Sequence, residues 1–235
     1  MSRICTICAR GGSKGVKNKN LKLILGKPLI AHSILQAKAS GIFDVIAVSS
    51  DSQEILQVAK EYGADVVIER PAELATDKAA KLPVIQHCVQ EAEKHTGLLF
   101  DVMTDIDATS PLRTMEDLKN SVRLLENHEK ASNLITGSHS RRSPYFNLVE
   151  QNSDGFVHLS KKLPAAVVRR QDAPKSFDMN ASIYVWKREF FFKDLSIFTP
   201  KTILYEMPEE RSIDIDSELD FEIVSFLAEK RGTLL

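Results

Sequence analysis

The residues with the clearest chemical potential form a glycine-rich, basic loop near the start of the chain. The segment Ala9-Arg10-Gly11-Gly12-Ser13-Lys14-Gly15 directly follows the apolar run Ile4–Cys8. A buried strand that opens into such a loop exposes backbone N–H groups beside cations, and glycines allow a ligand to approach closely. The loop has neither the GxxxxGK[ST] pattern of a P-loop nor the GxGxxG pattern of a dinucleotide site. It favours polyphosphate binding, with an ordinary tight turn as the alternative.

Two pairs of aspartates occur where later strands are expected to end. Asp105 and Asp107 form one pair, and Asp214 and Asp216 form the other. Residues i and i+2 of an extended segment face the same way, so each pair can converge on one cation. Mg²⁺ prefers oxygen ligands and keeps phosphate and water as its remaining ligands. We expect a metal at Asp214 and Asp216, beside a helix cap formed by Asp216 or Ser217. For Asp105 and Asp107, a metal site and capping of the following turn both stay open.

Arginines in two further segments could bind anions. Arg70 opens the segment RPAELATD after an expected strand, where its guanidinium can reach a base or a phosphate. Arg169 and Arg170 lie close before FDMN, and they either bind a carboxylate or remain in solvent. Neither segment is decisive alone.

Composition narrows the class of protein. The chain has 235 residues, a net charge of −1, 43% hydrophobic and 27% charged residues, which suits one globular α/β domain without an overall attraction to nucleic acid or membranes. It shows no stretch of 18 apolar residues and no cleavable leader pattern. Three cysteines favour a reducing compartment. Cys5 and Cys8 are three positions apart in an expected strand, so they face opposite sides and form no redox pair. We expect a cytoplasmic protein.

The first half of the chain alternates strands and helices. Such alternation predicts a mostly parallel, Rossmann-like sheet with helices on both faces and ligands beyond the carboxyl ends of the strands. Expected strands are 3–8, 45–49, 66–68, 102–107 and 133–136, and expected helices are 28–39, 53–62, 82–94 and 114–127. The pattern resumes later with strands at 181–186 and 202–207 and a last helix at 218–230.

Residues 139–180 interrupt this alternation. They combine four arginines with short strand-like pieces at 145–150 and 155–159. Such a segment has too little apolar surface for a core of its own, so we expect a β-rich insertion that packs on a second subunit. The prediction is therefore one domain, 1–235, which forms a homodimer through this insertion.

The ordered motifs resemble a known family. ARGGSKG, NKNLK, RPAELATD, TSPLR, FDMNASIY and SIDIDSELD follow one another as in the CMP-sialic acid synthetases, which are acylneuraminate cytidylyltransferases of nucleotidyltransferase α/β fold. The resemblance covers essentially the whole chain. It implies that CTP and a nine-carbon 2-keto sugar acid give a CMP-sugar and pyrophosphate. It also implies Mg²⁺ and a homodimer whose insertion reaches the partner's active site.

The resemblance, together with residues that adjoin its matching positions, gives a set of expected site residues. Arg10, Lys14, Asp214 and Asp216 would be catalytic, and the two aspartates would hold the metal. The nucleotide site would comprise Ala9, Arg10, Gly11, Gly12, Lys14, Asn20, Arg70 and Lys81. The sugar-acid site would comprise Asp107, Thr109, Ser110, Arg170, Asn180 and Tyr184.

The chain departs from the family pattern near the substrate. Asp107-Ala108 replaces Gln-Pro before TSPLR, Asp178 stands where relatives often have arginine, and Lys81 replaces a hydroxyl-bearing residue. Asp107 favours a donor-rich sugar substituent, so legionaminic and pseudaminic acids stay open beside sialic acid. The alternatives are a glycosyltransferase with Asp105 and Asp107 as a DxD motif, and a nucleotide-binding module without turnover.

Overall fold

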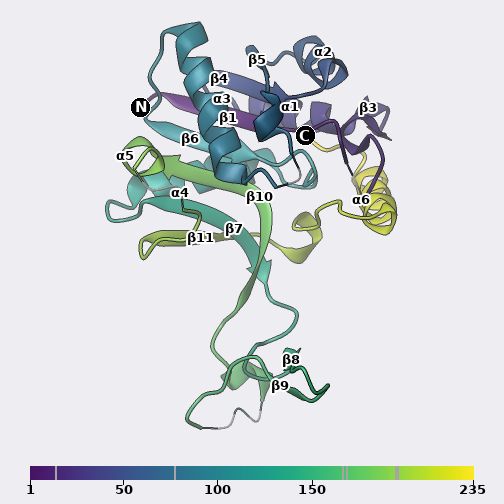
Figure 1. Cartoon of the computed structure of the whole chain (residues 1–235), viewed down its shortest axis with the longest axis vertical. Helices are drawn as coiled ribbons and strands as arrows, with labels where there is room; N and C mark the ends of the chain where they lie inside the picture. The colour runs from purple at the N-terminus through teal and green to yellow at the C-terminus, as the bar shows by residue number, and fades with distance from the viewer. Residues whose placement is uncertain (14, 77, 166, 168, 194–195) are drawn as a thin grey trace.

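The chain is built around one twisted sheet. The computed structural model describes residues 1–13, 15–76, 78–165, 167, 169–193 and 196–235. The seven strands lie in the order β11-β7-β10-β6-β1-β4-β5, and all run in one direction except β10, which is antiparallel to both neighbours (Figure 1). The mostly parallel sheet expected from the sequence is confirmed. The strands are β1 (Arg3–Cys8), β4 (Val45–Ser50), β5 (Val66–Glu69), β6 (Val102–Ile106), β7 (Asn133–His139), β10 (Phe177–Lys187) and β11 (Thr202–Glu206).

Helices cover both faces of this sheet. Apolar residues of α1 (Leu29–Ser40), α2 (Gln53–Glu61) and α4 (Met115–Asn127) pack on one face, together with Cys5. Residues of α3 (Lys81–Thr96) and α5 (Arg188–Phe191) pack on the other face, where Cys8 lies. The two cysteines of β1 thus face opposite sides, as expected. Successive residues of a central strand enter different cores, which explains why these strands read as continuous apolar runs.

A third, smaller core lies beside the carboxyl edge of the sheet. It joins α6 (Glu218–Arg231) to the segment after β1 through Val16, Leu29, Leu112 and Ile215. This core therefore connects the start of the chain to its end. Short elements complete this region and the loops elsewhere: the β2–β3 hairpin (Leu23–Ile24, Lys27–Pro28) and the 3₁₀ turns η1 (Lys19–Leu21), η2 (Ala72–Leu74), η3 (Arg170–Asp172) and η4 (Glu209–Arg211).

Local capping fixes where several helices begin. Ser52 accepts a hydrogen bond from the N–H of Ile55 at the start of α2. Thr114 and Ser217 each form a reciprocal capping box with an aspartate three residues later, at α4 and α6. Of the two residues considered as the cap of the last helix, Ser217 is the one that caps it, which leaves the Asp216 carboxylate outside the helix.

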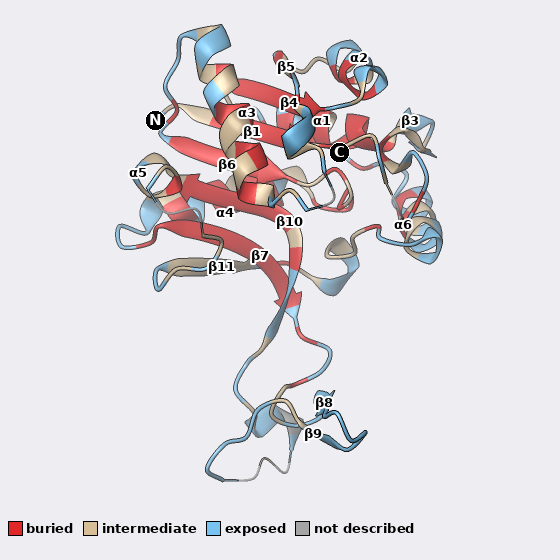
Figure 2. Cartoon of the chain, viewed as in Figure 1, coloured by how far each residue is buried: buried red, intermediate tan, exposed pale blue. Residues whose placement is uncertain are grey.

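The expected insertion is an arm that extends away from the sheet (Figure 1). It leaves at the paired ends of β7 and β10 and carries a separate two-stranded sheet, β8 (Val149–Gln151) with β9 (Val157–Leu159). The expected strand at 145–150 forms only from Val149. Residues 177–179, which we assigned to the insertion, already pair with β7 as part of β10. Most of the arm is exposed in this single chain (Figure 2).

Over the described ranges, the chain contains no helix with the length and apolar character needed to cross a membrane.

Candidate functional site

A cavity of about 550 Å³ opens at the carboxyl edge of the sheet. This edge is where open α/β sheets bind ligands, and the volume suits a small molecule. One end is polar and charged, with Arg10, Ser13, Gly15, Lys19 and Asp216 in its lining. The lining also contains less polar residues, among them Cys8, Leu74, Ala79 and Val84.

The front loop (residues 9–15) and the acidic loop (residues 212–217) meet in this cavity. A Cβ atom on Gly15 would overlap the backbone carbonyl of Asp216, so only glycine permits this approach. Lys19 strengthens the contact, since its ammonium donates to the Ile215 carbonyl and lies 3.6 Å from the Asp216 carboxylate. The glycine-rich loop and the loop of the late aspartates therefore meet in the fold, where Asp216 belongs to the cavity lining and Asp214 does not.

Two predicted nucleotide-binding residues are held firmly at the cavity wall. The Asn20 amide nitrogen donates to the Arg10 carbonyl at 3.1 Å, while its Oδ1 is buried without a hydrogen-bond partner among the described residues. An unpaired buried acceptor beside a cavity is suited to a hydrogen-bond donor of a ligand, because a buried acceptor without a hydrogen bond is destabilising. Arg70 is 7% exposed and donates to the Ser49 carbonyl at 2.8 Å. Its guanidinium is thus fixed where β4 ends.

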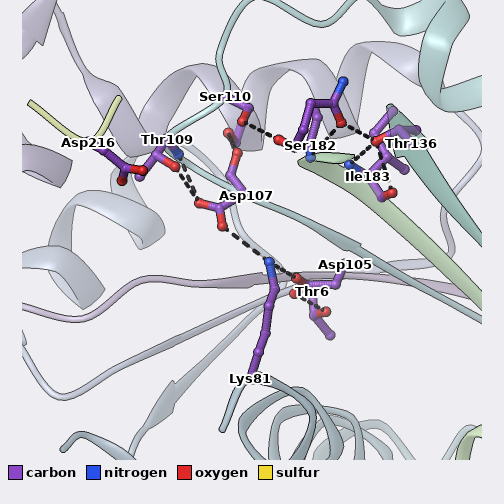
Figure 3. A network of polar contacts seen from close by, with 12 residues as sticks. Thr6, Lys81, Asp105, Asp107, Thr109, Ser110, Thr136, Ser182, Ile183 and Asp216 are labelled. Atoms are coloured by element: carbon purple, nitrogen blue, oxygen red, sulfur yellow. Dashed lines mark hydrogen bonds and ion pairs between the residues drawn. The ribbon is translucent and has the colours of Figure 1, made fainter. Parts of the chain in front are cut away.

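Asp105 and Asp107 do converge on a cation, and that cation is a lysine. The Lys81 ammonium lies 3.3 Å from Asp105 and 3.1 Å from Asp107 (Figure 3). It also lies 4.4 Å from the centre of the Tyr184 ring. Thr6 donates to the other oxygen of Asp105 at 2.9 Å. An internal ammonium therefore occupies the place that a DxD motif would give to a metal ion.

Lys81, Asp105 and Asp107 form an ion triad in which the pKa values of all three side chains are shifted. Burial disfavours the charge of Asp107, but Lys81 and the hydrogen bonds from Thr109 lower its pKa to about 2. Burial outweighs Lys81 at Asp105 and raises the pKa of that carboxyl. Burial also opposes the charge of Lys81, whose pKa is nevertheless raised by Asp107 and Asp105. The triad thus holds a permanent cation near neutral pH.

A buried arginine supports the loop that carries Asp107. Arg113 is 1% exposed, and its guanidinium donates to the carbonyls of Asp107 and Ser110, each at 2.7 Å. It also donates to the hydroxyl of Ser33 on α1. The Thr109 carbonyl in turn accepts the Ile215 N–H at 2.9 Å. Arg113 therefore braces the turn that connects the ion triad to the acidic loop.

The acidic loop has a donor set that fits Mg²⁺. Burial raises the pKa of Asp214, and the nearby Asp216 raises it further. Such mutual repulsion is relieved by a cation, and Mg²⁺ is commonly held by one or two carboxylates plus substrate phosphates. Among the residues that the structure describes, no three acidic, histidine or cysteine side chains form a complete metal cage. A metal here would also need oxygen atoms from a bound substrate as ligands.

The structure places the other predicted residues unevenly. Ala9 and Thr109 line the cavity, but Gly11 and Gly12 do not belong to its lining. The Gly11 N–H is already donated to Asp51, at 2.9 Å. Lys14 lies outside the described residues, as does the side chain of Arg170.

Three predicted sugar-acid residues are buried behind the lining. The Asn180 side chain accepts from Thr136 and donates to Ser212, so both of its amide atoms have protein partners. Ser110 donates to the Asn180 carbonyl, while Tyr184 lies beneath Lys81 (Figure 3 labels Ser110 and Thr136). Their direct binding of a sugar stays a prediction; in the ligand-free fold they support the residues that line the cavity.

Lys19, Gly15 and Arg113 are site residues that the sequence argument did not assign. Lys19 stands in the quoted motif NKNLK and Arg113 in TSPLR, so the motifs pointed to both. Gly15 was quoted as part of the front loop, but its contact with Asp216 depends on a pairing of two distant segments. No local pattern could have identified that contact.

Comparisons with known proteins indicate the family of the chain. The family model described as "Cytidylyltransferase" matches residues 4–231. CMP-N,N'-diacetyllegionaminic acid synthase of Campylobacter jejuni is 47% identical over 95% of this chain and 94% of its own length. Post-translational flagellin modification protein B of Campylobacter coli is 46% identical, over 97% of this chain and 96% of its own length.

A solved structure shares the fold at lower identity. The structure of CMP:2-keto-3-deoxy-manno-octonic acid synthetase complexed with CTP has a TM-score of 0.69 at 16% identity, over 98% of this chain and all of the other. It supports the architecture alone. The family model matches nearly the whole chain, and two relatives are almost half identical to it. The chain therefore belongs to the cytidylyltransferase family.

Proposed function

We propose that this protein is a CMP-nonulosonic acid synthase that couples CTP to a nine-carbon 2-keto sugar acid and releases pyrophosphate. The observation that carries the proposal is the single cavity in which the front loop, Arg70, Lys81 and the acidic loop meet. The relative named CMP-N,N'-diacetyllegionaminic acid synthase supports the class of reaction and the class of sugar.

The reaction is an in-line displacement at the α-phosphorus. The anomeric 2-hydroxyl of the sugar acid forms the new O–P bond, and the bond to the pyrophosphate leaving group breaks. Such a transition state requires positioning and charge neutralisation more than covalent help. Arg10 and Lys19 at the charged end supply positive charge near the phosphates, and Lys14 is expected to join them. Asp216 lines the cavity and is the acceptor we propose for the hydroxyl proton.

Mg²⁺ is the cofactor that suits this site. Asp214 and Asp216 would hold it together with phosphate oxygens, in accordance with their mutual repulsion. Bound there, the ion would neutralise charge on the phosphates. The surrounding chain prepares the position, because Asp220 accepts hydrogen bonds from the N–H groups of Asp216 and Ser217 at 3.1 and 2.8 Å. The acidic loop is therefore ordered before a ligand binds.

A homodimer accounts for the exposed apolar side chains of the arm. Phe156 is 72% exposed just before β9, and Val157 is 63% exposed at the start of β9, on a two-stranded sheet that is separate from the central one. A lone hairpin is only marginally stable, and apolar patches of this kind mark interaction surfaces. We propose that the arm packs on a second copy, where it can also reach the partner's cavity. CTP as a substrate and three free cysteines support a cytoplasmic location.

Among sugar acids we favour a legionaminic-type substrate. The relative named for CMP-N,N'-diacetyllegionaminic acid is 47% identical over 95% of this chain. A glycosyltransferase is disfavoured, since Lys81 occupies the position of the cation in the DxD reading.

The test is a panel of nonulosonic acids with CTP and Mg²⁺, read by pyrophosphate release. We expect the diacetylated legionaminic acid to have the highest kcat/KM, ahead of pseudaminic and N-acetylneuraminic acids. Tight CTP binding without pyrophosphate from any sugar acid would instead support a module without turnover. Release of a sugar from a CMP-sugar to an acceptor would support the glycosyltransferase.

A further inference from the structure

Two members of the ion triad of Lys81, Asp105 and Asp107 line the cavity, where they can contact a ligand. Lys81 is the first residue of α3, where a cation is disfavoured by the helix dipole. The two carboxylates compensate for that cost and fix the ammonium 4.4 Å from the ring centre of Tyr184. Even so, the side chains of Lys81 and Asp107 are 29% and 28% exposed, and both line the cavity. The pair is therefore accessible to a ligand.

Counting hydrogen bonds shows what the pair can still offer. An ammonium has three donors, and Asp105 and Asp107 take two of them. No third acceptor contacts Lys81 within the described part of the chain. On Asp107, Oδ1 accepts from the N–H and the hydroxyl of Thr109, and Oδ2 accepts from Lys81. A carboxylate has about four acceptor positions, so one remains on Oδ2. One donor and one acceptor thus stand side by side, 3.1 Å apart.

Lys81 and Asp107 are also linked to lining residues of two different kinds. Lys81 lies one helical turn before Val84, which belongs to the apolar lining. Asp107 is bonded to Thr109, whose carbonyl binds the acidic loop beside Asp216 (Figure 3). In a nucleoside triphosphate, the ribose likewise connects a flat aromatic base, whose faces can pack on apolar side chains, to charged phosphates.

We propose that Lys81 and Asp107 together bind the ribose hydroxyls of the nucleotide and so select a ribonucleotide over a deoxyribonucleotide. The proposal rests on the proposed function, in which a nucleoside triphosphate occupies the cavity. A ribose hydroxyl both donates and accepts, and it is matched by an ammonium proton beside a carboxylate oxygen. Asp107 then serves the nucleotide, in contrast to the sugar-acid role predicted from the sequence.

The size of the effect follows from the charges. Hydrogen bonds to charged groups are stronger than those between neutral groups. A ligand that lacks the hydroxyl leaves the free donor of Lys81 and the free acceptor of Asp107 without hydrogen bonds. We expect the protein to bind CTP about 10- to 100-fold more tightly than 2′-deoxy-CTP or 3′-deoxy-CTP. At least one of the two deoxynucleotides should show this loss.

The experiment measures nucleotide binding directly by calorimetry, with Mg²⁺ and without a sugar acid. Lys81→Met removes the donor, and Asp107→Asn weakens the acceptor while leaving Lys81 bound to Asp105. Lys22→Met is the matched control, because Lys22 also combines an ion pair, at 2.7 Å to Glu218, with a position 4.3 Å over an aromatic ring. It does not belong to the cavity lining. Thermal unfolding without ligand establishes that each variant is folded.

The proposal predicts that Lys81→Met and Asp107→Asn bring the ratio of CTP to deoxy-CTP affinity close to one, whereas Lys22→Met retains it. If Lys81→Met does not fold, Asp107→Asn alone carries the comparison. CTP binding with no deoxynucleotide discrimination in the wild type, or with equal discrimination in all variants, would overturn the inference and leave the proposed function intact. Failure of the wild type to bind any nucleotide would overturn both.

Discussion

Charged side chains at the cavity neutralise one another before any ligand is bound. Asp107 has a pKa of about 2 because Lys81 and Thr109 stabilise its charge against burial. The pKa of Asp105 is raised because burial dominates there. The shared ammonium is therefore what keeps both carboxylates tolerable inside the fold.

Lys81→Met should make stability depend on pH. Without the ammonium, burial and mutual repulsion raise the pKa values of Asp105 and Asp107 above those of the unfolded chain. The native state then binds more protons than the unfolded state, so stability falls as pH rises through the raised pKa values. Thermal unfolding should show a deficit relative to the wild type that grows as the pH rises above about 4, the ordinary pKa of an aspartate. A deficit independent of pH would mean that Lys81 acts by packing alone.

Asp216→Ala should reduce turnover at least ~10²-fold, by analogy with the removal of one charge-stabilising group. Asp216 is the carboxylate of the acidic loop that lines the cavity, and its side chain is 81% exposed, so its loss should spare the fold. Pyrophosphate release at saturating CTP and Mg²⁺ measures the effect. Glu218→Ala, two residues later and outside the lining, is the control. Near-wild-type turnover of the Asp216 variant would remove this residue from the mechanism.

The chemistry of single residues was only partly visible in the sequence. The spacing of Asp105 and Asp107 correctly indicated that both face one cation, because alternate strand residues share a side. That the cation is Lys81 depends on the tertiary packing that brings the first residue of α3 to Asp105 of β6 and Tyr184 of β10. Asn180 is expected at the sugar, and its amide connects Thr136 of β7 to Ser212 of the acidic loop. Side-chain partners of this kind arise from tertiary packing, which no local pattern encodes.

At the scale of elements, the site is made by the contact between the front loop and the acidic loop. Gly15→Ala should disturb that contact, because its Cβ would overlap the Asp216 backbone, which cannot yield as a flexible side chain could. We expect kcat/KM to fall at least about tenfold, which corresponds to about 1.4 kcal/mol of transition-state stabilisation.

Gly12→Ala is the matched control for the front loop. A Cβ on Gly12 would meet no atom within 4 Å, so this variant should retain activity within about twofold, a change worth less than about 0.5 kcal/mol. Equal losses in the two variants would show that loop flexibility, and not the contact between loops, is what the glycines provide.

The capping box of α6 should stabilise both the helix and the backbone of the acidic loop. Ser217→Ala removes a hydroxyl that binds Asp220 at 2.7 Å, and Asp220 also holds the Asp216 N–H. We expect a loss of about 1 kcal/mol in unfolding free energy and a higher Mg²⁺ requirement for turnover. Thr114→Ala breaks the same motif at α4, so it should cost similar stability without altering the Mg²⁺ requirement. An unchanged Mg²⁺ requirement in both variants would contradict the link.

Elements were the most predictable level of this fold. Ser52, Thr114 and Ser217 act through local chemistry, and the helices that they cap begin where the sequence indicated. The expected strand at 181–186 is instead part of β10, which starts at Phe177. This difference has a tertiary cause, because residues 177–179 pair with the end of β7. They precede a bulge in β10 at which Ala181 has a φ of 51°.

At the scale of the whole molecule, the arm has the properties of an interface. Phe156→Asp should therefore weaken dimerisation, which sedimentation velocity or light scattering measures as a shift towards monomer. Phe226→Asp is the control, because Phe226 is 63% exposed on α6, away from the arm. A monomeric wild type, or equal dissociation of both variants, would refute an arm-mediated dimer.

A dimer of this form leads to a test of how the two cavities are completed. If the arm of one subunit serves the cavity of the other, then Asp216→Ala disables a subunit's own cavity, whereas Arg170→Ala in η3 disables its partner's. Each variant alone should be inactive as a homodimer. In a mixed dimer, the cavity with an intact Asp216 receives an intact arm, so mixing should restore activity to about a quarter of the wild-type level if subunits exchange at random and half of the dimers contain one working cavity. No recovery after confirmed subunit exchange would place the arm at its own cavity, because each chain would then carry its own defect.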